Sequence, residues 1–333
     1  MFDNKTIFIT GGTGFFGKNF ILRLFRSYKP KKVIIFSRDE TKQYEIQNDI
    51  IFKKYLKNLR FFIGDVRDVD RLKLAMRNVD FVVHAAALKH VPSAEYNPTE
   101  CIKTNISGAE NVISAAIECN VKKVIALSTD KAANPINIYG ATKLASDKLF
   151  IAANNLSGLY GPKFSVLRYG NVFASRGSVV PFFKKLLNDK SKFFPITDLK
   201  MTRFVISIDE AINLVFKSFK FMVAGEIIIP KIPSIKILDL ARALDKNKKI
   251  KIVGIRPGEK LHEILCPADD SRLTLEFKNH YIIIPSTNFD VQKKKFKKNF
   301  NNEVGKFVKS NFSYESGNNP KFLNIKEIKK LLN

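Results

Sequence analysis

A glycine-rich turn near the N-terminus constrains the fold more than any other feature. An apolar run over residues 6–10 leads into Gly11-Gly-Thr-Gly-Phe-Phe-Gly17, and a helical pattern continues from Phe15 to about Phe25. The glycines fit both G-x-G-x-x-G and G-x-x-G-x-x-G. A strand that enters such a turn and leaves it as a helix brings backbone N–H groups close to a pyrophosphate. The sequence therefore predicts a dinucleotide-binding unit at the start of the chain.

Apolar runs and helical patterns alternate through the first half of the chain. Strands are expected over residues 32–36, 60–63, 81–84, 121–127 and 164–168, and helices over 43–57, 102–120 and from 138 onward. Such alternation is typical of a parallel sheet covered by helices on both faces. We predict an α/β fold: a doubly wound Rossmann domain over residues 1–170, then a smaller C-terminal substrate-binding lobe. The lobe would take up most of 171–333, with some segments returning to the sheet.

The residues at the predicted strand ends indicate which cofactor binds, because ligands of these sheets bind beyond the carboxyl ends of the strands. The second strand ends in Ser37-Arg38-Asp39. A Ser-Arg pair suits the 2′-phosphate of NADP, whereas Asp39 keeps the ribose hydroxyl of NAD as an alternative. Asp65 and Ala85 follow the third and fourth strands.

The stretch from Leu127 to Lys143 offers two sets of acid–base groups. Thr129, Asp130 and Lys131 end the fifth strand. Tyr139 and Lys143 are four residues apart in a helical pattern and so share one face. A Lys ammonium beside a phenol favours the phenolate, so we expect a lowered pKa for Tyr139. The Tyr-Lys pair alone is common by chance in a lysine-rich chain, and Asp130-Lys131 alone would suit a surface turn. We predict a catalytic role for both sets because a dinucleotide site is expected upstream on the same sheet.

Composition narrows the classes of function. The net charge of +26 is compatible with nucleic-acid binding, but the basic residues are spread along the chain and only residues 293–298 form a dense run. We therefore expect no dedicated nucleic-acid partner; a dinucleotide sensor or RNA-binding module remains the alternative outside enzymes. No apolar run reaches the ~18 residues of a membrane span, and no signal peptide is apparent. Cys101, Cys119 and Cys266 lack metal-binding spacing, so we expect reduced thiols, a cytoplasmic protein and no metal site.

Four motifs together resemble a known family. They are His84-Ala-Ala-Ala-Leu-Lys-His-Val-Pro92, Leu127-Ser-Thr-Asp-Lys-Ala-Ala-Asn-Pro135, Met201-Thr-Arg-Phe204 and Arg256-Pro-Gly-Glu-Lys-Leu-His-Glu263. With the glycine turn and the Tyr-Lys pair, they resemble the inverting UDP-N-acetylglucosamine 4,6-dehydratases of the extended short-chain dehydrogenase/reductases. The resemblance covers nearly the whole chain and implies a lyase that makes the first intermediate of pseudaminic acid. It also implies a homo-oligomer.

The resemblance implies roles for individual residues. The catalytic set would be Thr129, Asp130, Lys131, Tyr139 and Lys143. Contacts to NADP would come from Gly11, Thr13, Gly14, Phe15, Phe16, Gly17, Ser37, Arg38, Asp39, Lys42, Asp65, Val66, Ala85, Lys89, Tyr139, Lys143 and Val172. The UDP-sugar would be bound by Lys89, Asn171, Arg203, Arg256 and Glu259.

The implied mechanism assigns a proton transfer to each group. Tyr139 takes the proton of the C4 hydroxyl, Lys131 removes the C5 proton, and Asp130 protonates the departing C6 hydroxyl. Lys131 would have to be neutral, and burial, Lys143 and the nicotinamide are expected to lower its pKa. Retaining 4,6-dehydratases resemble this chain but carry Asp-Glu where it has Asp130-Lys131. A retaining dehydratase and a UDP-sugar C4-epimerase are the alternatives within the fold.

Overall fold

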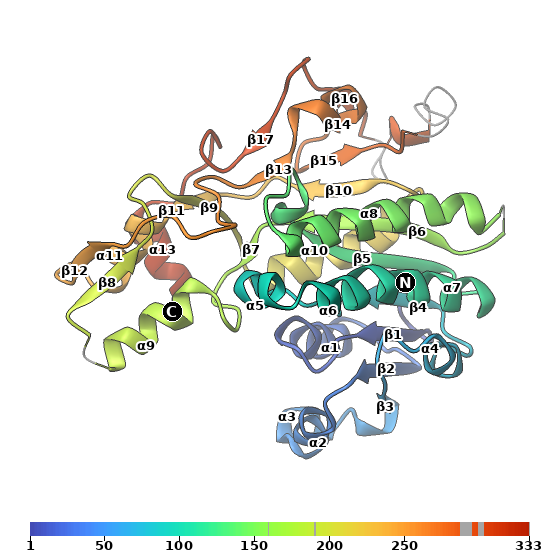
Figure 1. Cartoon of the computed structure of the whole chain (residues 1–333). Helices are drawn as coiled ribbons and strands as arrows, with labels where there is room; N and C mark the ends of the chain where they lie inside the picture. Colours follow the sequence, from blue (N-terminus) through green and yellow to red (C-terminus); the bar gives the residue numbers. More distant parts are fainter. Residues whose placement is uncertain (159, 190, 287–294, 299–302, 333) are drawn as a thin grey trace.

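The computed structural model describes residues 1–158, 160–189, 191–286, 295–298 and 303–332 (Figure 1). Its centre is a ten-stranded sheet with the order β16-β14-β15-β10-β6-β5-β4-β1-β2-β3. The strands from β3 to β10 run parallel: β3 Leu59–Ile63, β2 Lys32–Ser37, β1 Thr6–Thr10, β4 Phe81–His84, β5 Lys123–Thr129, β6 Lys163–Tyr169 and β10 Ile227–Pro230. At the other edge, β15 His280–Ile283, β14 Thr274–Glu276 and β16 Lys306–Phe307 pair antiparallel.

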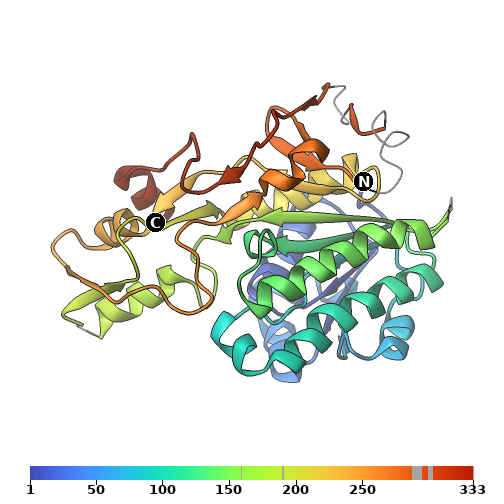
Figure 2. The same cartoon turned by 45° about the horizontal axis from the view of Figure 1, so that its top comes forward.

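Helices cover both faces of the parallel strands, which confirms the predicted doubly wound α/β fold (Figures 1 and 2). One layer contains α4 Val69–Ala75, α5 Val91–Tyr96, α6 Pro98–Ile102, the π-helical turn η2 Lys103–Ser107, α7 Gly108–Glu118 and α8 Ile138–Leu156. The other contains α1 Phe15–Ser27 and α10 Ile208–Phe221, which pack on each other. The short elements α2 Glu40–Asn48, α3 Ile50–Lys53 and η1 Leu56–Asn58 connect β2 to β3.

Phenylalanine fills the space between the sheet and the second helix layer. Phe2 is fully buried, and its ring centroid lies 5.5 Å from that of Phe81 on the sheet and 5.4 Å from that of Phe216 on α10. Phe20 on α1 lies 5.4 Å from the same Phe216 ring. Aromatic rings bury large apolar areas, so this cluster anchors α1, and with it the glycine turn, to the sheet.

The lobe beyond β6 is built from small sheets and helices. Its sheets are β11-β9-β7 and β12-β8, and in a third pair, β13-β17, strand β13 contacts the turn η3 Asp130–Ala132. Their bounds are β7 Asn171–Val172, β8 Phe193–Ile196, β9 Thr202–Ile206, β11 Ser234–Lys236, β12 Lys249–Ile252, β13 Ile264–Cys266 and β17 Tyr314–Glu315. The helices are α9 Val179–Asn188, α11 Ile237–Leu244 and α13 Ile325–Leu332. Separate apolar clusters around Phe173 and Phe183 give the lobe cores of its own.

The segments beyond residue 170 divide between the two parts of the molecule. α10 and strands β10, β14, β15 and β16 join the main sheet or its covering layer. We propose a domain boundary near residue 170 on this basis. No helix among the described residues is long and apolar enough to cross a membrane.

Two predicted helices are interrupted. The helix expected over 43–57 breaks at Asp49, whose side chain accepts a hydrogen bond from Ile51 N at 2.9 Å and begins α3. The helix expected over 102–120 contains the π-helical turn η2. The fifth strand was predicted over 121–127 but spans Lys123–Thr129, which carries Thr129 to its carboxyl end. The dense basic run over 293–298 lies partly outside the described residues, and so does the weakly patterned segment 290–313.

Candidate active site

A cavity of about 1020 Å³ lies at the carboxyl ends of the parallel strands. Every residue predicted to bind the cofactor lines it, from the glycine turn through Ser37 and Asp65 to Val172. Thr129, Lys131, Tyr139, Lys143, Lys89 and Asn171 line it as well. The topology explains this convergence, because parallel strands bring their carboxyl ends to one edge of the sheet.

The glycine turn is shaped for close approach. Gly11 has φ +66°, and a Cβ there would lie 3.1 Å from Ala86 N. A Cβ on Gly17 would lie 2.4 Å from Gly12 O, so only glycine lets α1 pack against the turn. Gly14 is the N-cap of α1 and provides no side-chain cap. The first N–H groups of α1 therefore have no capping side chain, which suits an anionic group at the helix N-terminus.

The polar residues at the end of β2 differ in what they can offer a ligand. Asp39 caps α2 by accepting a hydrogen bond from Lys42 N at 2.9 Å, and its carboxylate is also paired with Lys42 Nζ. Hydrogen bonds from Lys42 lower the pKa of Asp39, with a smaller contribution from the positive charge of Arg176. The Asp39 carboxylate is thus engaged within the protein. Arg38 is half-exposed and makes a 3.5 Å contact to Asp65 Oδ2.

The loop after β4 is held by a buried hydroxyl. Thr10 Oγ1 accepts hydrogen bonds from Ala85 N at 3.0 Å and Ala86 N at 3.1 Å, and lies 2.9 Å from His84 Nδ1. Farther along, Lys89 Nζ donates to Arg176 O at 3.1 Å, so this lysine spans the cavity toward the lobe. Burial lowers the pKa of Lys89.

The Tyr139–Lys143 pair lies on the first turns of α8. Asn137 caps this helix by accepting from Gly140 N at 2.8 Å, and its amide donates to Gly258 O at 2.7 Å. Lys143 Nζ donates to Leu127 O at 2.9 Å, and burial lowers its pKa. The prediction of a lowered pKa for Tyr139 is wrong for this structure: burial raises it to about 12, and the opposing effects of Lys131 and Thr129 are weaker.

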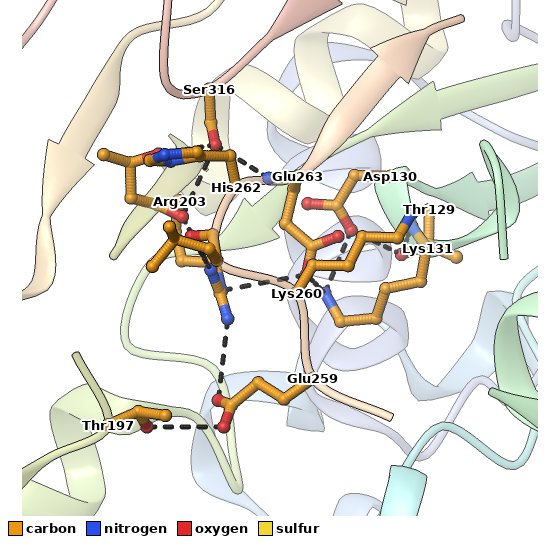
Figure 3. Close-up of polar contacts among 12 residues, drawn as sticks. Thr129, Asp130, Lys131, Thr197, Arg203, Glu259, Lys260, His262, Glu263 and Ser316 are labelled. Atoms are coloured by element: carbon orange, nitrogen blue, oxygen red, sulfur yellow. Dashed lines mark hydrogen bonds and ion pairs between the residues drawn. The ribbon is translucent and has the colours of Figure 1, made fainter. Parts of the chain in front are cut away.

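Lys131 lies between two carboxylates (Figure 3). Its Nζ is 3.0 Å from Asp130 Oδ1 and 3.0 Å from Glu263 Oε1. Burial alone would lower the pKa of Lys131, but the two carboxylates raise it well above its usual value. The expectation of a lowered pKa for Lys131 is therefore corrected, because sequence reasoning did not include Glu263. Burial raises the pKa of Asp130, as a carboxylic acid that donates a proton requires.

The predicted substrate residues fall into two groups. Lys89 and Asn171 line the cavity. Arg203, Arg256 and Glu259 form a network beside it. Glu259 lies 3.5 Å from Arg203 Nη2 (Figure 3). It also lies 3.3 Å from Arg256 Nε. Arg203 is buried, whereas Arg256 is largely exposed. Arg256 thus offers a free edge of its guanidinium, while Arg203 is engaged by protein carboxylates.

Sequence reasoning missed two charged residues of the site. Glu263 is the last residue of a motif that was singled out, but nothing local showed that it would meet Lys131. Arg176 lines the cavity and acts electrostatically on Asp39. Its position within the segment flanked by Gly170 and Gly177 was the available signal. Within the described part of the chain, no cluster of His, Cys, Asp and Glu is suited to hold a metal ion.

Comparisons with known proteins identify the family to which this chain belongs. Residues 7–285 match the model of a family described as polysaccharide biosynthesis protein. An inverting UDP-N-acetylglucosamine 4,6-dehydratase of Campylobacter jejuni strain 81-176 is 59% identical over 100% of this chain and 98% of its own length. The chain belongs to the family of the inverting UDP-N-acetylglucosamine 4,6-dehydratases.

Other relatives of this dehydratase family are more distant. A protein of Rickettsia canadensis named UDP-glucose 4-epimerase is 41% identical over 100% of this chain and 96% of its own length. The X-ray structure of Pen from Bacillus thuringiensis superposes with a TM-score of 0.87 at 36% identity, covering 99% of this chain and 98% of that one. The predicted family resemblance is confirmed.

Proposed function

We propose that this chain is a UDP-N-acetylglucosamine 4,6-dehydratase that inverts C5 and gives UDP-2-acetamido-2,6-dideoxy-L-arabino-4-hexulose. The observation that carries the proposal is the Asp130–Lys131 pair at the end of β5, in which Lys131 lines the same cavity as Tyr139 and Asp130 is fully buried beside it. An acid and an amine side by side provide one group for the C6 hydroxyl and another for the C5 proton. The relative at 59% identity bears the same activity in its name.

The cavity fits a dinucleotide, and we infer NADP. The glycine turn leaves space that any Cβ would fill, and the α1 N-terminus is free of a side-chain cap. Arg38 is exposed beside Ser37, whereas the Asp39 carboxylate is engaged by Lys42. A guanidinium suits a 2′-phosphate, and an engaged carboxylate is a poor acceptor for a ribose 2′-hydroxyl. When bound, the nicotinamide accepts a hydride from C4 and returns it to C6, and its positive charge favours the Tyr139 phenolate.

The chain's own residues then move three protons. Tyr139 takes the proton of the C4 hydroxyl, with Thr129 placed to hydrogen-bond the C4 oxygen. Lys131 removes the C5 proton, which the 4-ketone has made acidic. Asp130 protonates the departing C6 hydroxyl, so that water leaves. A proton that comes from solvent then reprotonates C5 on the opposite face, which gives inversion, and the cofactor is regenerated within each turnover.

The mechanism requires a neutral acid at Asp130 and a neutral amine at Lys131. One proton transfer within the ion pair gives both forms. Moving a proton from Lys131 Nζ to Asp130 Oδ1, across 3.0 Å, gives a neutral amine and a neutral acid. Burial of Asp130 favours its neutral form, which makes this transfer less costly than release of the proton to solvent. The pair can therefore be primed without a change in total charge.

For the nucleotide sugar, we propose contacts from Lys89 and Asn171 in the cavity and from Arg203, Arg256 and Glu259 beside it. Lys89 and Arg256 offer positive charge to phosphate oxygens. Glu259 bridges the two arginines and would hold them in place. Of the wider predictions, a homo-oligomer, a cytoplasmic location, a place in pseudaminic acid synthesis and the absence of a nucleic-acid partner stay predictions.

The relatives named UDP-glucose 4-epimerase favour a second candidate function, C4-epimerization. Incubation of the purified protein with UDP-N-acetylglucosamine and NADP⁺, followed by mass spectrometry, separates the two. The dehydratase product has lost one water, whereas an epimer keeps the mass of the substrate. We expect loss of water with no net reduction of NADP⁺. A product of unchanged mass would overturn the proposal.

A further inference from the structure

Glu263 is a buried carboxylate placed against the proposed base. It lies directly before β13, and its side chain is only 2% exposed. Its Oε1 lies 3.0 Å from Lys131 Nζ and 3.7 Å from Arg203 Nε (Figure 3). Burial would raise the pKa of Glu263, yet Lys131 and Arg203 lower it below its usual value, so it stays ionised.

The main chain of Glu263 is fixed from the lobe. Glu263 N donates to Ser316 Oγ at 2.9 Å, and Ser316 N donates back to Glu263 O at 2.8 Å. The hydroxyl groups of Ser316 and Thr202 lie 2.7 Å apart, and Thr202 Oγ1 lies 2.8 Å from His262 Nδ1. The segment around Ser316, near the end of the chain, thus fixes the position of Glu263 relative to the end of β5.

We propose that Glu263 is a positioning residue that acts through Lys131: it fixes the Lys131 amine at the reacting carbon and strengthens it as the base for C5. This inference rests on the proposed function and deepens it. Neither Asp130 nor Tyr139 can play this part, since each has a proton transfer of its own.

The charges around Lys131 show why a second carboxylate matters. Asp130, from η3 Asp130–Ala132, and Glu263 place negative charge beside the Lys131 amine and raise its pKa. The positive charges of Arg203 on β9 and of Lys260, in the loop before β13, act in the opposite direction. Tyr139 on α8 faces the same group. Once Asp130 is a neutral acid, Glu263 is the anion that remains at 3.0 Å from Lys131. An anion at that distance favours the ammonium form.

The proton step balances with Glu263 as a spectator that keeps its charge. The C5–H bond breaks, its proton goes to Lys131 Nζ, and its electron pair moves onto the C4 carbonyl oxygen as an enolate. The new ammonium forms beside the Glu263 carboxylate, which stabilises the charge that develops in the transition state. A stronger base also needs a higher pH to become neutral, so the same contact sets the acid limb of the pH–rate profile.

Glu263→Gln removes the charge and keeps the shape, so it tests this role. We expect the acid limb of kcat to move to lower pH by about 1–3 units, because an opposite charge at this distance shifts a pKa by that amount. We also expect the plateau rate to fall, because the base is weaker. Glu263→Asp shortens the side chain and moves the carboxylate away from Lys131, so it should shift the acid limb in the same direction but by less. Glu226→Gln is the matched control, since Glu226 is also buried but its carboxylate accepts hydrogen bonds from Val223 N and Ala224 N rather than from Lys131.

A second readout does not depend on turnover. In protein labelled with ¹³Cε-lysine, the Lys131 signal, assigned by its loss in Lys131→Arg, should titrate at lower pH in both Glu263 variants than in the wild type. Unmoved titration and an unmoved acid limb would overturn the inference, even if the plateau rate fell, because a merely structural residue would lower the rate alone. Wild-type protein that makes no ketosugar would overturn the proposed function instead, and the titration would still decide the role of Glu263. If Glu263→Gln does not fold, Glu263→Asp decides by the same two measurements.

Discussion

The two halves of the cavity are built in different ways. The dinucleotide half is formed by backbone: glycines at 11, 14 and 17, and small residues after β4. The acid–base half is formed by side-chain ion pairs whose partners are far apart in sequence, such as Lys131 with Glu263. The first half depends on shape and the second on charge. Adding one methyl group should therefore impair the dinucleotide half, and changing a protonation state should impair the acid–base half.

The largest effect is expected in the half that depends on charge. Lys131→Arg keeps a cation for Asp130 and Glu263, but a guanidinium cannot become a neutral base at working pH. We expect turnover to fall by about 10²–10⁴, the usual contribution of a general base, with little change in the unfolding midpoint. Steady-state rates and urea denaturation measure the two. Lys32→Ala, at an exposed position of β2, is the control. Full activity in Lys131→Arg would remove this lysine from the mechanism.

A smaller loss, of stability and cofactor binding together, is expected in the half that depends on shape. In Gly17→Ala the new Cβ would lie 2.4 Å from Gly12 O, a backbone atom, so α1 has to move. We expect about 1–3 kcal/mol less stability, the usual cost of overpacking, and weaker NADP⁺ binding by calorimetry. Gly14→Ala, whose Cβ would meet only Gly11 O at 3.1 Å, should be less destabilised. Equal stability of the two variants would contradict the packing argument.

Cofactor choice tests whether charge matters at all in the dinucleotide half. Arg38→Ala should weaken NADP⁺ binding about tenfold relative to NAD⁺, since a hydrogen bond to a charged group contributes about 1.5 kcal/mol or more. Titration calorimetry with both dinucleotides gives the ratio. Arg60→Ala on β3, whose guanidinium bonds to the carbonyl of Lys57, is the matched control. A ratio that Arg38→Ala leaves unchanged would favour NAD.

The last effect, which leaves activity at neutral pH unchanged, concerns stability below neutral pH. Burial lowers the pKa of His84 to about 3, against an ordinary 6.5. The unfolded chain therefore binds a proton that the folded chain does not, so the contribution of His84 is complete above pH 6.5 and is lost as pH falls toward 3. In His84→Gln, the slope of unfolding free energy against pH between 6 and 4 should be shallower by up to about 1.4 kcal/mol per pH unit. Urea denaturation across that range measures it, and parallel slopes would count against a neutral buried His84.

Sequence reasoning succeeded where the determinants are local. The glycine turn, the strand ends and the Tyr139–Lys143 spacing lie within short stretches, and the cavity includes each of them. The helix expected over 43–57 was wrong because Asp49 begins a new helix by capping, which outweighs a weak polar pattern.

The charge states could not be predicted from the sequence. The pKa of Lys131 depends on Glu263, and that of Tyr139 on how deeply α8 is buried. Contacts between residues so far apart arise only once the lobe folds back onto the sheet. The motif that ends in Glu263 was recognised, but its charge could not be assigned to a partner.

The central claim is that Lys131, held beside Asp130 and Glu263, takes a proton from C5 and that C5 is rebuilt with the opposite configuration. The most direct test is turnover of UDP-N-acetylglucosamine with NADP⁺ in deuterated water, followed by NMR. We predict a 6-deoxy-4-ketosugar that carries deuterium at C5 in the L-arabino configuration. A recovered sugar without change, or a ketosugar that retains its original C5 configuration, would contradict the account.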